Sequence, residues 1–424
     1  MRRSPVRFRS SAHFFKTMAS ESFISLKDVQ EADQRIAQYI RRTPSIPFDY
    51  LNRQLGKEII LKAEIFQKTG SFKFRGAANC VLSQMAQAKK AGVVAASAGN
   101  HAQGVASICH LLGISSTIVM PISTPGIKIQ NTQRWGAKIE LVGNVYDESY
   151  DHAVKLSQEQ GSLLIHPFKD PLVQAGQGTL GLEILNEPLT KETEAVLISV
   201  GGGGLITGVG TVLRALNPKI KIYGLTAQSA PAAYQAVKSK TPKESPVTFT
   251  LAEGVATKKT EQMMLDNISR QVDDVFSLSE ESIAKAISVL AEQGKMVVEG
   301  AGALPVAALL EGLIPEKRVT AVLCGGNIDL PALSAVFRRG MIEQGRLVRL
   351  LIMIWDRPGT LHTITEVFAQ KRANIVEVHH TRSALSHRMG EASIEVEIET
   401  RGHEHTQEII DALSQRGFHV ERQS

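Results

Sequence analysis

The sequence predicts an α/β protein with mostly parallel sheets, followed by a smaller domain of a different design. Two observations favour this fold class. Between residue 25 and about residue 340, short apolar runs alternate with stretches of helical periodicity, and after that point the order of the predicted elements changes. The chain of 424 residues is 43% hydrophobic, which is enough apolar material for more than one core.

The large domain contains short apolar runs that we interpret as buried strands. Helical periodicity fills residues 100–112 and 124–135, and another helix runs from the glycines after Val200 through Leu216. Ligands in folds of this class bind at the carboxyl ends of the strands, so chemistry is expected there. The predicted strands are residues 93–97, 116–120, 138–142, 194–200, 220–228 and 318–324.

The last part of the chain has its own order of elements, βαββαβ, which predicts a ferredoxin-like domain. We place the large domain at residues 25–340, a linker at 341–346 and the small domain at 347–424, because charged residues and glycines gather between Arg338 and Gly345. The small domain has no catalytic pattern, so we interpret it as a regulatory or assembly module. Its predicted elements are residues 346–355, 359–372, 375–381, 392–400, 405–415 and 418–422.

Composition argues against several classes of protein. The sequence has no run of eighteen apolar residues, so no membrane span is predicted. The three cysteines, Cys80, Cys109 and Cys324, are widely spaced and odd in number, which favours free thiols in a reducing compartment such as the cytoplasm. No paired cysteine or histidine spacing indicates a zinc site.

The positive charge is concentrated in the first twenty residues. Five of the six net positive charges lie there, and no acidic residue accompanies them. Because the remainder is nearly neutral, no nucleic-acid partner is expected. Residues 1–24 are interpreted as a disordered basic extension, although such an arginine-rich segment is also typical of an organelle-targeting peptide. The five residues are Arg2, Arg3, Arg7, Arg9 and Lys16.

A run of four glycines follows the strand predicted at residues 194–200. Glycines ahead of a helix let backbone N–H groups converge on an anion, which predicts a phosphate site. The spacing fits neither a dinucleotide-binding fingerprint nor a Walker A loop, and a tight structural turn is the alternative. The run comprises Gly201, Gly202, Gly203 and Gly204.

Two further turns follow predicted strands. Residues 97–101 (SAGNH) join a strand to a helix and can either cap that helix or hold a carboxylate. Residues 324–327 (CGGN) come at the end of another strand. The cysteine in this turn is either a small buried apolar residue or a thiol placed against a ligand.

Residues 67–76 (QKTGSFKFRG) contain a lysine in unusual surroundings. Lys73 lies between Phe72 and Phe74, in a chain with only 5% aromatic residues. Burial against apolar groups lowers the pKa of a lysine, and the neutral amine is then available as a nucleophile or a base. Lys68 has no such flanks and is expected to be solvated.

In this order and spacing, the four features closely resemble the pyridoxal-phosphate enzymes of fold type II, which have the tryptophan synthase β-like fold of two subdomains with open sheets. Within that group the chain is similar to the threonine dehydratase (threonine ammonia-lyase) and serine racemase branch. The resemblance covers about residues 25–340 and includes residues 297–303 (VVEGAGA). Residues 355–361 (WDRPGTL) make the small domain resemble an ACT domain, a ligand-sensing module.

The resemblance implies a pyridoxal 5'-phosphate cofactor and a role for each of several residues. Lys73 would hold the cofactor as a Schiff base and later move the Cα proton. Asn100 would hydrogen-bond the ring hydroxyl, Phe72 would pack beside the ring, and Cys324 would face the pyridine nitrogen. The four glycines and the amide of Leu205 would hold the phosphate.

The resemblance further implies that Ser97, Asn100 and His101 hold the substrate carboxylate, and that L-threonine is deaminated to 2-oxobutanoate and ammonia and L-serine to pyruvate. Racemase relatives place a proton-donating serine where this chain has Ala98, which argues against racemisation. A serine racemase or another fold type II amino-acid lyase is the alternative. Those relatives also have carboxylates for a metal in a segment that has none here, residues 227–234, and no metal is expected.

An ACT-like domain implies allosteric regulation. We expect an amino acid such as isoleucine or valine to bind between paired small domains. Small sheets with exposed edges tend to pair, which favours a homodimer or homotetramer. The sequence leaves open whether the enzyme serves isoleucine biosynthesis or threonine breakdown.

Overall fold

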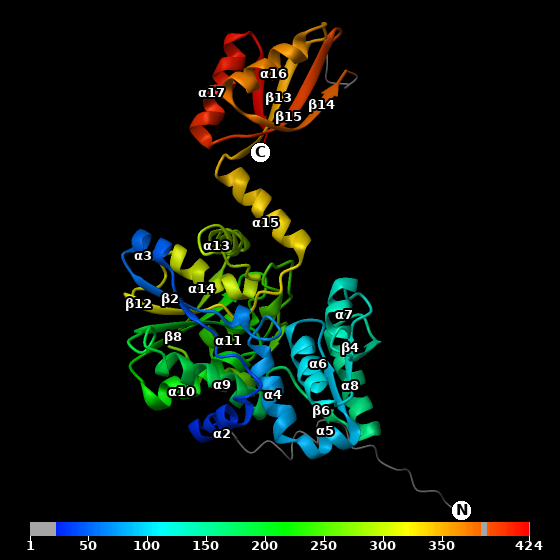
Figure 1. Cartoon of the computed structure of the whole chain (residues 1–424), viewed down its shortest axis with the longest axis vertical. Coiled ribbons are helices and arrows are strands. Elements are labelled where there is room, and N and C mark those ends of the chain that lie inside the picture. Colours follow the sequence, from blue (N-terminus) through cyan, green and yellow to red (C-terminus); the bar gives the residue numbers. More distant parts are fainter. Residues whose placement is uncertain (1–22, 383–387, 424) are drawn as a thin grey trace, which may run out of the picture. The chain divides into compact units, whose positions relative to one another are not determined.

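The computed structural model describes residues 23–382 and 388–423 (Figure 1). The chain divides after Ile328 into two compact units. The basic extension predicted at residues 1–24 lies outside the described residues, except for Phe23 and Ile24.

A six-stranded sheet forms the centre of the first unit. Its order is β1, β2, β12, β7, β8 and β11, and all neighbours are parallel except β1 and β2. Every residue of β7 is buried, as expected for a parallel strand covered on both faces. The strands are β1 Ser45–Pro47, β2 Glu58–Lys62, β7 Ala195–Ser199, β8 Lys221–Ala227, β11 Asp274–Leu278 and β12 Arg318–Val322.

A smaller, four-stranded parallel sheet lies in the same unit, in the order β5, β4, β3, β6 (Figure 1). Alternate residues of β3 face opposite sides, because side chains alternate along a strand. Val93 and Ala95 join the core with α4 and α6, whereas Val94 packs against Ala153 of α8. The strands are β3 Val93–Ala96, β4 Ser116–Met120, β5 Lys138–Leu141 and β6 Leu163–Leu164. The predicted α/β architecture with two open sheets is confirmed.

The helices of the first unit approach one another closely through glycine. A Cβ added to Gly208 of α10 would lie 2.3 Å from the Gln174 carbonyl of α9, and one on Gly176 would lie 2.7 Å from the Arg75 carbonyl of α4. Larger residues at these positions would force the helices apart. The helices are α2 Leu26–Ile36, α3 Asp49–Leu55, α4 Lys73–Ser83, α5 Met85–Ala91, α6 Asn100–Leu112, α7 Gly126–Gln133, α8 Tyr146–Gln160, α9 Pro171–Asn186, α10 Gly204–Leu216, α11 Ala232–Ser239, α12 Gln262–Gln271, α13 Glu280–Glu292 and α14 Gly300–Leu310.

A buried cluster of ion pairs holds α4 against α9 and the end of β2. Arg75 forms ion pairs with Glu64 and Glu183, both at 2.7 Å, and Lys62 forms a pair with Glu183 at 2.9 Å. All four side chains have 1% exposure or less. Each buried charge therefore has an opposite charge beside it, which offsets the cost of removing both from water.

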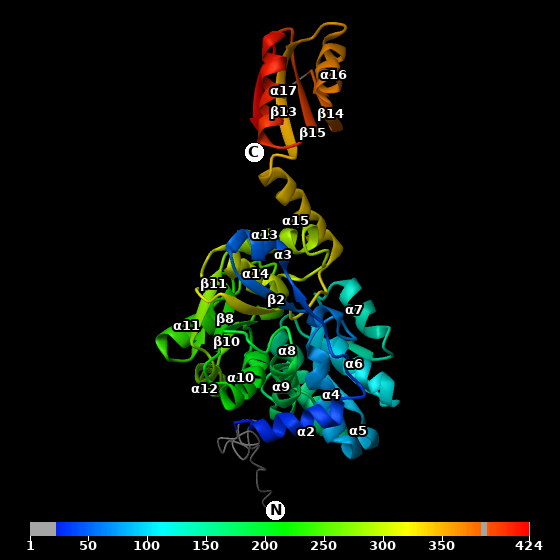
Figure 2. The same ribbon diagram turned by 60° about the vertical axis from the view of Figure 1, so that its left-hand side comes forward.

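The second unit contains the βαββαβ domain that the sequence predicts, and this prediction is confirmed. Its antiparallel sheet has the order β14, β15, β13, β16, and α16 and α17 cover one face (Figure 2). The elements are β13 Leu347–Trp355, α16 Thr360–Lys371, β14 Asn374–Thr381, β15 Glu391–Glu399, α17 His403–Gln415 and β16 His419–Gln423.

The first half of the region predicted to be a linker is helical. Helix α15 (Leu330–Glu343) belongs to the second unit and continues through the charged residues that suggested an irregular segment. Arg338 forms an ion pair with Glu397 of β15, and Arg339 forms one with Glu343 on the next turn. The part of the predicted linker at 341–343 is therefore helix, and the left-handed Gly345 follows it.

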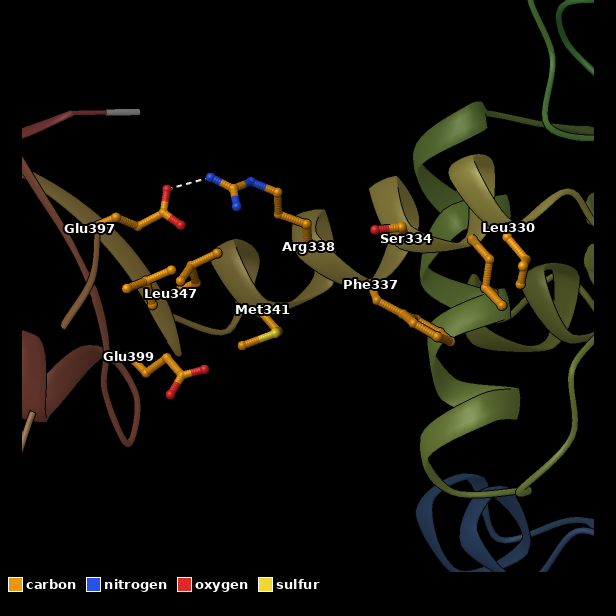
Figure 3. Close-up of a pocket in the computed structure, with 10 residues that line it drawn as sticks. Leu330, Ser334, Phe337, Arg338, Met341, Leu347, Glu397 and Glu399 are labelled. Atoms are coloured by element: carbon orange, nitrogen blue, oxygen red, sulfur yellow. Dashed lines mark hydrogen bonds and ion pairs between the residues drawn. The ribbon is translucent and has the colours of Figure 1, made fainter. Parts of the chain in front are cut away.

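A groove lies between α15 and the sheet within the second unit (Figure 3). One wall is mainly apolar and comes from α15, while Glu397 and Glu399 line the opposite side. Glu397 is tied by ion pairs to Arg338 and Arg349. The groove thus combines an apolar wall with charges that are already partly paired.

Candidate active site

Backbone hydrogen bonds tie the loop that precedes α4 to the segment that follows β12. The Phe72 amide donates to the Cys324 carbonyl at 3.0 Å, and the Gly326 amide donates to the Gly70 carbonyl at 2.9 Å. Ser71 and Gly325 form an antiparallel bridge between these two bonds. Lys73 begins α4 directly after this anchor, so its amine is placed near the carboxyl end of β12.

The amine of Lys73 lies in the low-dielectric surroundings that the sequence predicts. Its Nζ donates to the Pro167 carbonyl at 2.9 Å and lies 5.1 Å from the centroid of the Phe72 ring. Burial lowers the pKa of Lys73 to about 8, although Cys324 and Glu299 act in the opposite direction. A substantial fraction of this amine is therefore neutral near physiological pH.

The glycine run forms the turn between β7 and α10. Gly203 has a φ of 87°, which disfavours any residue with a side chain. A Cβ on Gly202 would lie 2.3 Å from the Phe168 ring. Within the described part of the chain, the backbone N–H groups of residues 201–205 have no hydrogen-bond acceptor, so the positive end of α10 can receive an anion.

The SAGNH turn brings β3 to the start of α6. The Ser97 hydroxyl accepts a hydrogen bond from the Gly99 amide at 3.2 Å, which fixes the turn. Asn100 is the first residue of α6, and its side chain donates to Glu299 at 2.8 Å and accepts from Asn327 at 2.7 Å. The turn thereby connects the small sheet to two segments next to the large sheet.

The ring of His101 is buried and lies against the backbone of the segment after β6. Its Nε2 lies 3.2 Å from the Ile165 carbonyl, so this nitrogen carries the proton, and the side chain is 2% exposed. Burial, and then the charge of Lys73, lower the pKa of His101 to about 3. A neutral imidazole in this position supplies no positive charge for a substrate carboxylate, and this geometry favours the backbone N–H groups of the turn instead.

Cys324 is buried at 3% exposure, just beyond the end of β12. Burial raises the pKa of its thiol, and the Glu299 carboxyl raises it further. The thiol is consequently neutral. Cys324 and Lys73 each affect the pKa of the other, so the two side chains lie near one another.

Two residues of the site were not singled out from the sequence. Glu299, just before α14, lies within the VVEGAGA segment, and Asn327 ends the CGGN turn. Burial raises the pKa of Glu299 to about 7, against the effect of its hydrogen bond from Asn100. An acidic residue in an otherwise apolar and glycine-rich run was the available signal for Glu299.

No helix in the described ranges is long and apolar enough to cross a membrane. In the same ranges, no group of three or more histidine, cysteine or acidic side chains could hold a metal ion. Glu253, a carboxylate that follows the segment considered for a metal in the sequence, forms an ion pair with Lys128.

Comparison with known proteins identifies the family. The model of the pyridoxal-phosphate dependent enzyme family matches residues 36–325. The chain belongs to this family. An ACT domain model matches residues 343–416, so the second unit is an ACT domain.

Two relatives match this chain across both of its units. The chain is 43% identical over 395 residues to an L-threonine ammonia-lyase of Geobacter sulfurreducens, and the match covers 93% of this chain and 98% of that protein. An L-threonine ammonia-lyase of Thermotoga maritima is 40% identical, with 94% and 99% covered.

Solved structures confirm fold type II for the first unit. A threonine deaminase from tomato, Solanum lycopersicum, is 30% identical with a TM-score of 0.69, covering 79% of this chain and 90% of that one. A maize serine racemase is 31% identical with a TM-score of 0.70, covering 76% and 99%. Both lyases and racemases therefore share this fold.

The cofactor of the family is pyridoxal phosphate, and the residues present fit it. Lys73 would supply an amine for the aldehyde carbon, and the start of α10 would supply N–H groups for the phosphate. The buried hydroxyls of Thr69 and Ser71, in the loop that precedes Lys73, have no hydrogen-bond partner among the described residues. Buried polar atoms of this kind indicate a place that a polar ligand completes.

Replacement of Gly202 by alanine should weaken pyridoxal-phosphate binding by more than about tenfold, because the new Cβ would meet the Phe168 ring at 2.3 Å and displace the N–H groups of the turn. Gly126→Ala is the matched control, since no atom lies within 4 Å of its added Cβ. Cofactor titration of the two apo-proteins measures the difference. Equal affinities would contradict the assignment of the glycine turn to the phosphate.

The reaction of apo-protein with pyridoxal phosphate should depend on pH through Lys73. Because burial lowers the pKa of this amine to about 8, the rate should rise with pH and reach half its maximum near that value. Stopped-flow absorbance measures the rate, and Lys73→Ala gives the background. A midpoint near the ordinary lysine value of 10.5 would show that the amine is solvated.

Proposed function

We propose that this chain is an L-threonine ammonia-lyase that converts L-threonine to 2-oxobutanoate and ammonia. The observation that supports this most strongly is similarity to L-threonine ammonia-lyases over both units of the chain, with 98–99% of those proteins covered. A second support is chemical, because the amine of Lys73 has a lowered pKa and lies in a site that fits pyridoxal phosphate.

The bound cofactor supplies an electron sink for the bonds at the substrate Cα. The amine of Lys73, neutral in part near physiological pH, removes the Cα proton as a base. The start of α6 presents backbone N–H groups to the substrate carboxylate, together with the predicted contacts of Ser97 and Asn100. The β-hydroxyl leaves with a proton as water, and the released aminocrotonate tautomerises and is hydrolysed by water to 2-oxobutanoate and ammonia.

Cys324 suits elimination in its neutral form. A buried thiol, unlike a carboxylate, cannot stabilise a positive charge on a ring nitrogen beside it, so the electron sink is moderate. A moderate sink suffices when a leaving group on Cβ takes up the electrons as the Cα proton departs. We assign this position beside the ring nitrogen to Cys324 and a place beside the ring to Phe72.

Racemisation is the competing activity, because serine racemases share the fold. A racemase needs a proton donor on each face of the Cα centre. Ala98, half-buried in the turn before α6, has no proton to donate, whereas Lys73 serves one face only. This one-sided arrangement favours the lyase reaction, and by the same route L-serine would yield pyruvate.

Lys73→Ala should abolish turnover of both L-threonine and L-serine, measured as 2-oxobutanoate and pyruvate formation. The wild type should release little D-serine, and Ala98→Ser should raise D-serine formation at least several-fold, because a second proton donor then faces Cα. A Lys73→Ala variant with undiminished turnover would refute the proposed function. Abundant D-serine from the wild type would refute the argument from Ala98.

The ACT domain suits allosteric control by an amino acid such as isoleucine or valine, bound between paired domains of a homodimer or homotetramer. The open edges of β14 and β16 provide backbone groups for such pairing.

All three cysteines are free and buried, which supports a reducing, cytoplasmic setting and leaves targeting by residues 1–24 as the alternative.

An effector must bind one state of the enzyme better than the other. Added isoleucine or valine should therefore shift the threonine concentration for half-maximal velocity of the full-length holoenzyme, by roughly fivefold or more at saturation. Threonine kinetics with and without each amino acid measure the shift, and glycine serves as the control. Unchanged kinetics and no calorimetric heat with either amino acid would contradict this regulation.

A further inference from the structure

A chain of hydrogen bonds crosses the site and passes through Asn100. Asn327 donates through Nδ2 to the Thr69 carbonyl at 2.8 Å and to the Asn100 Oδ1 at 2.7 Å. Asn100 in turn donates through Nδ2 to the Glu299 Oε1 at 2.8 Å. The chain thus joins the loop before α4, the turn before α6 and the start of α14.

The direction of this chain is fixed at one end by a group that can only accept. The Thr69 carbonyl has no proton, so the Asn327 amide must turn its Nδ2 toward it. The second proton on the same nitrogen then points to Asn100, which must accept this hydrogen bond through its Oδ1. The orientation of the Asn100 carboxamide, which cannot be seen from its shape alone, follows from these two bonds.

Glu299 fixes the other end of the chain. Its own amide donates to the Gly325 carbonyl at 3.1 Å, and a Cβ on Gly325 would lie 2.2 Å from its Oε1. The carboxyl therefore lies against the backbone of the CGGN turn. Its Oε1 is an acceptor for Asn100 whether or not the carboxyl carries a proton on its other oxygen.

With its oxygen and one N–H engaged, the Asn100 side chain has one N–H left. We propose that Glu299 and Asn327 are positioning residues that lock the Asn100 carboxamide in one orientation, so that it offers the bound cofactor ring a donor. A donor stabilises the ionised form of the ring oxygen, whereas the reversed amide would place an acceptor there and repel it. Neither residue needs to touch the cofactor for this effect.

The inference rests on the proposed placement of the cofactor at Lys73 and Asn100 but not on the identity of the substrate. It can therefore be tested on substrate-free holoenzyme by absorbance. Pyridoxal phosphate bound to a lysine absorbs in the visible range when its ring oxygen is ionised and in the near ultraviolet when that oxygen is neutral. The ratio of the two bands reports whether Asn100 presents a donor or an acceptor to the ring oxygen. A failure of threonine turnover alone would leave this result unaffected.

In Asn327→Asp, the introduced carboxylate can only accept, so Asn100 would have to turn its N–H groups toward it and its oxygen away. The visible band should fall relative to the near-ultraviolet band by about tenfold, as for the loss of one hydrogen bond to a charged oxygen. Asn327→Ala is the matched control. It also loses the bond to Thr69, but alanine does not favour the reversed orientation of the Asn100 carboxamide, so the ratio of the two absorbance bands should change much less. Glu299→Gln keeps an acceptor oxygen and should retain the wild-type ratio.

The double variant that combines Asn327→Asp with Glu299→Gln provides the sharpest test. The introduced aspartate would accept from the reversed amide of Asn100 and the introduced glutamine would donate to it, so both hydrogen bonds of the Asn100 side chain can run in the opposite direction, while the bond to the Thr69 carbonyl is lost. Thermal stability should recover relative to Asn327→Asp alone while the visible band remains low. Recovery of both together, or equal band ratios in the aspartate and alanine variants, would show that these residues only support the fold and would overturn the proposal.

Discussion

The anchor between the loop before α4 and the segment after β12 is the constraint on which the site depends. Two backbone hydrogen bonds and a bridge hold residues 70–72 against residues 324–326. Because these are main-chain contacts, they fix the start of α4 whatever the side chains are. Lys73, Cys324 and Asn327 therefore share one location, although about 250 residues separate the first from the other two.

Burial of polar groups then determines their protonation. Lys73 and Glu299 would both be charged in water, yet burial moves the pKa of the first down to about 8 and of the second up to about 7. His101 and Cys324 stay neutral for the same reason. A site of this kind has little fixed charge of its own, so the N-termini of α6 and α10 and the positions of individual protons determine how it treats an anionic ligand.

Much of the fold and the site could be predicted because the turns that carry the predicted site residues follow buried strands. Strands such as β4 and helices such as α6 were found with their observed bounds, and Lys73 and the glycines stood out by composition. The partners of Asn100 could not be found in this way, since Glu299 and Asn327 meet it only through the tertiary fold. The ring direction of His101 depends likewise on the distant Ile165 carbonyl.

The position of β12 has a consequence for how the chain acquires its structure. This strand, the last of its sheet in sequence, lies between β2 and β7 and pairs with both. During synthesis the second edge of β2 stays unpaired until β12 has been made, that is, until residue 322 has emerged from the ribosome. Such long-range pairing is slow. A polypeptide that stopped short of Arg318 would display two unpaired apolar strand edges, so premature termination there would yield an aggregation-prone fragment instead of a shorter enzyme.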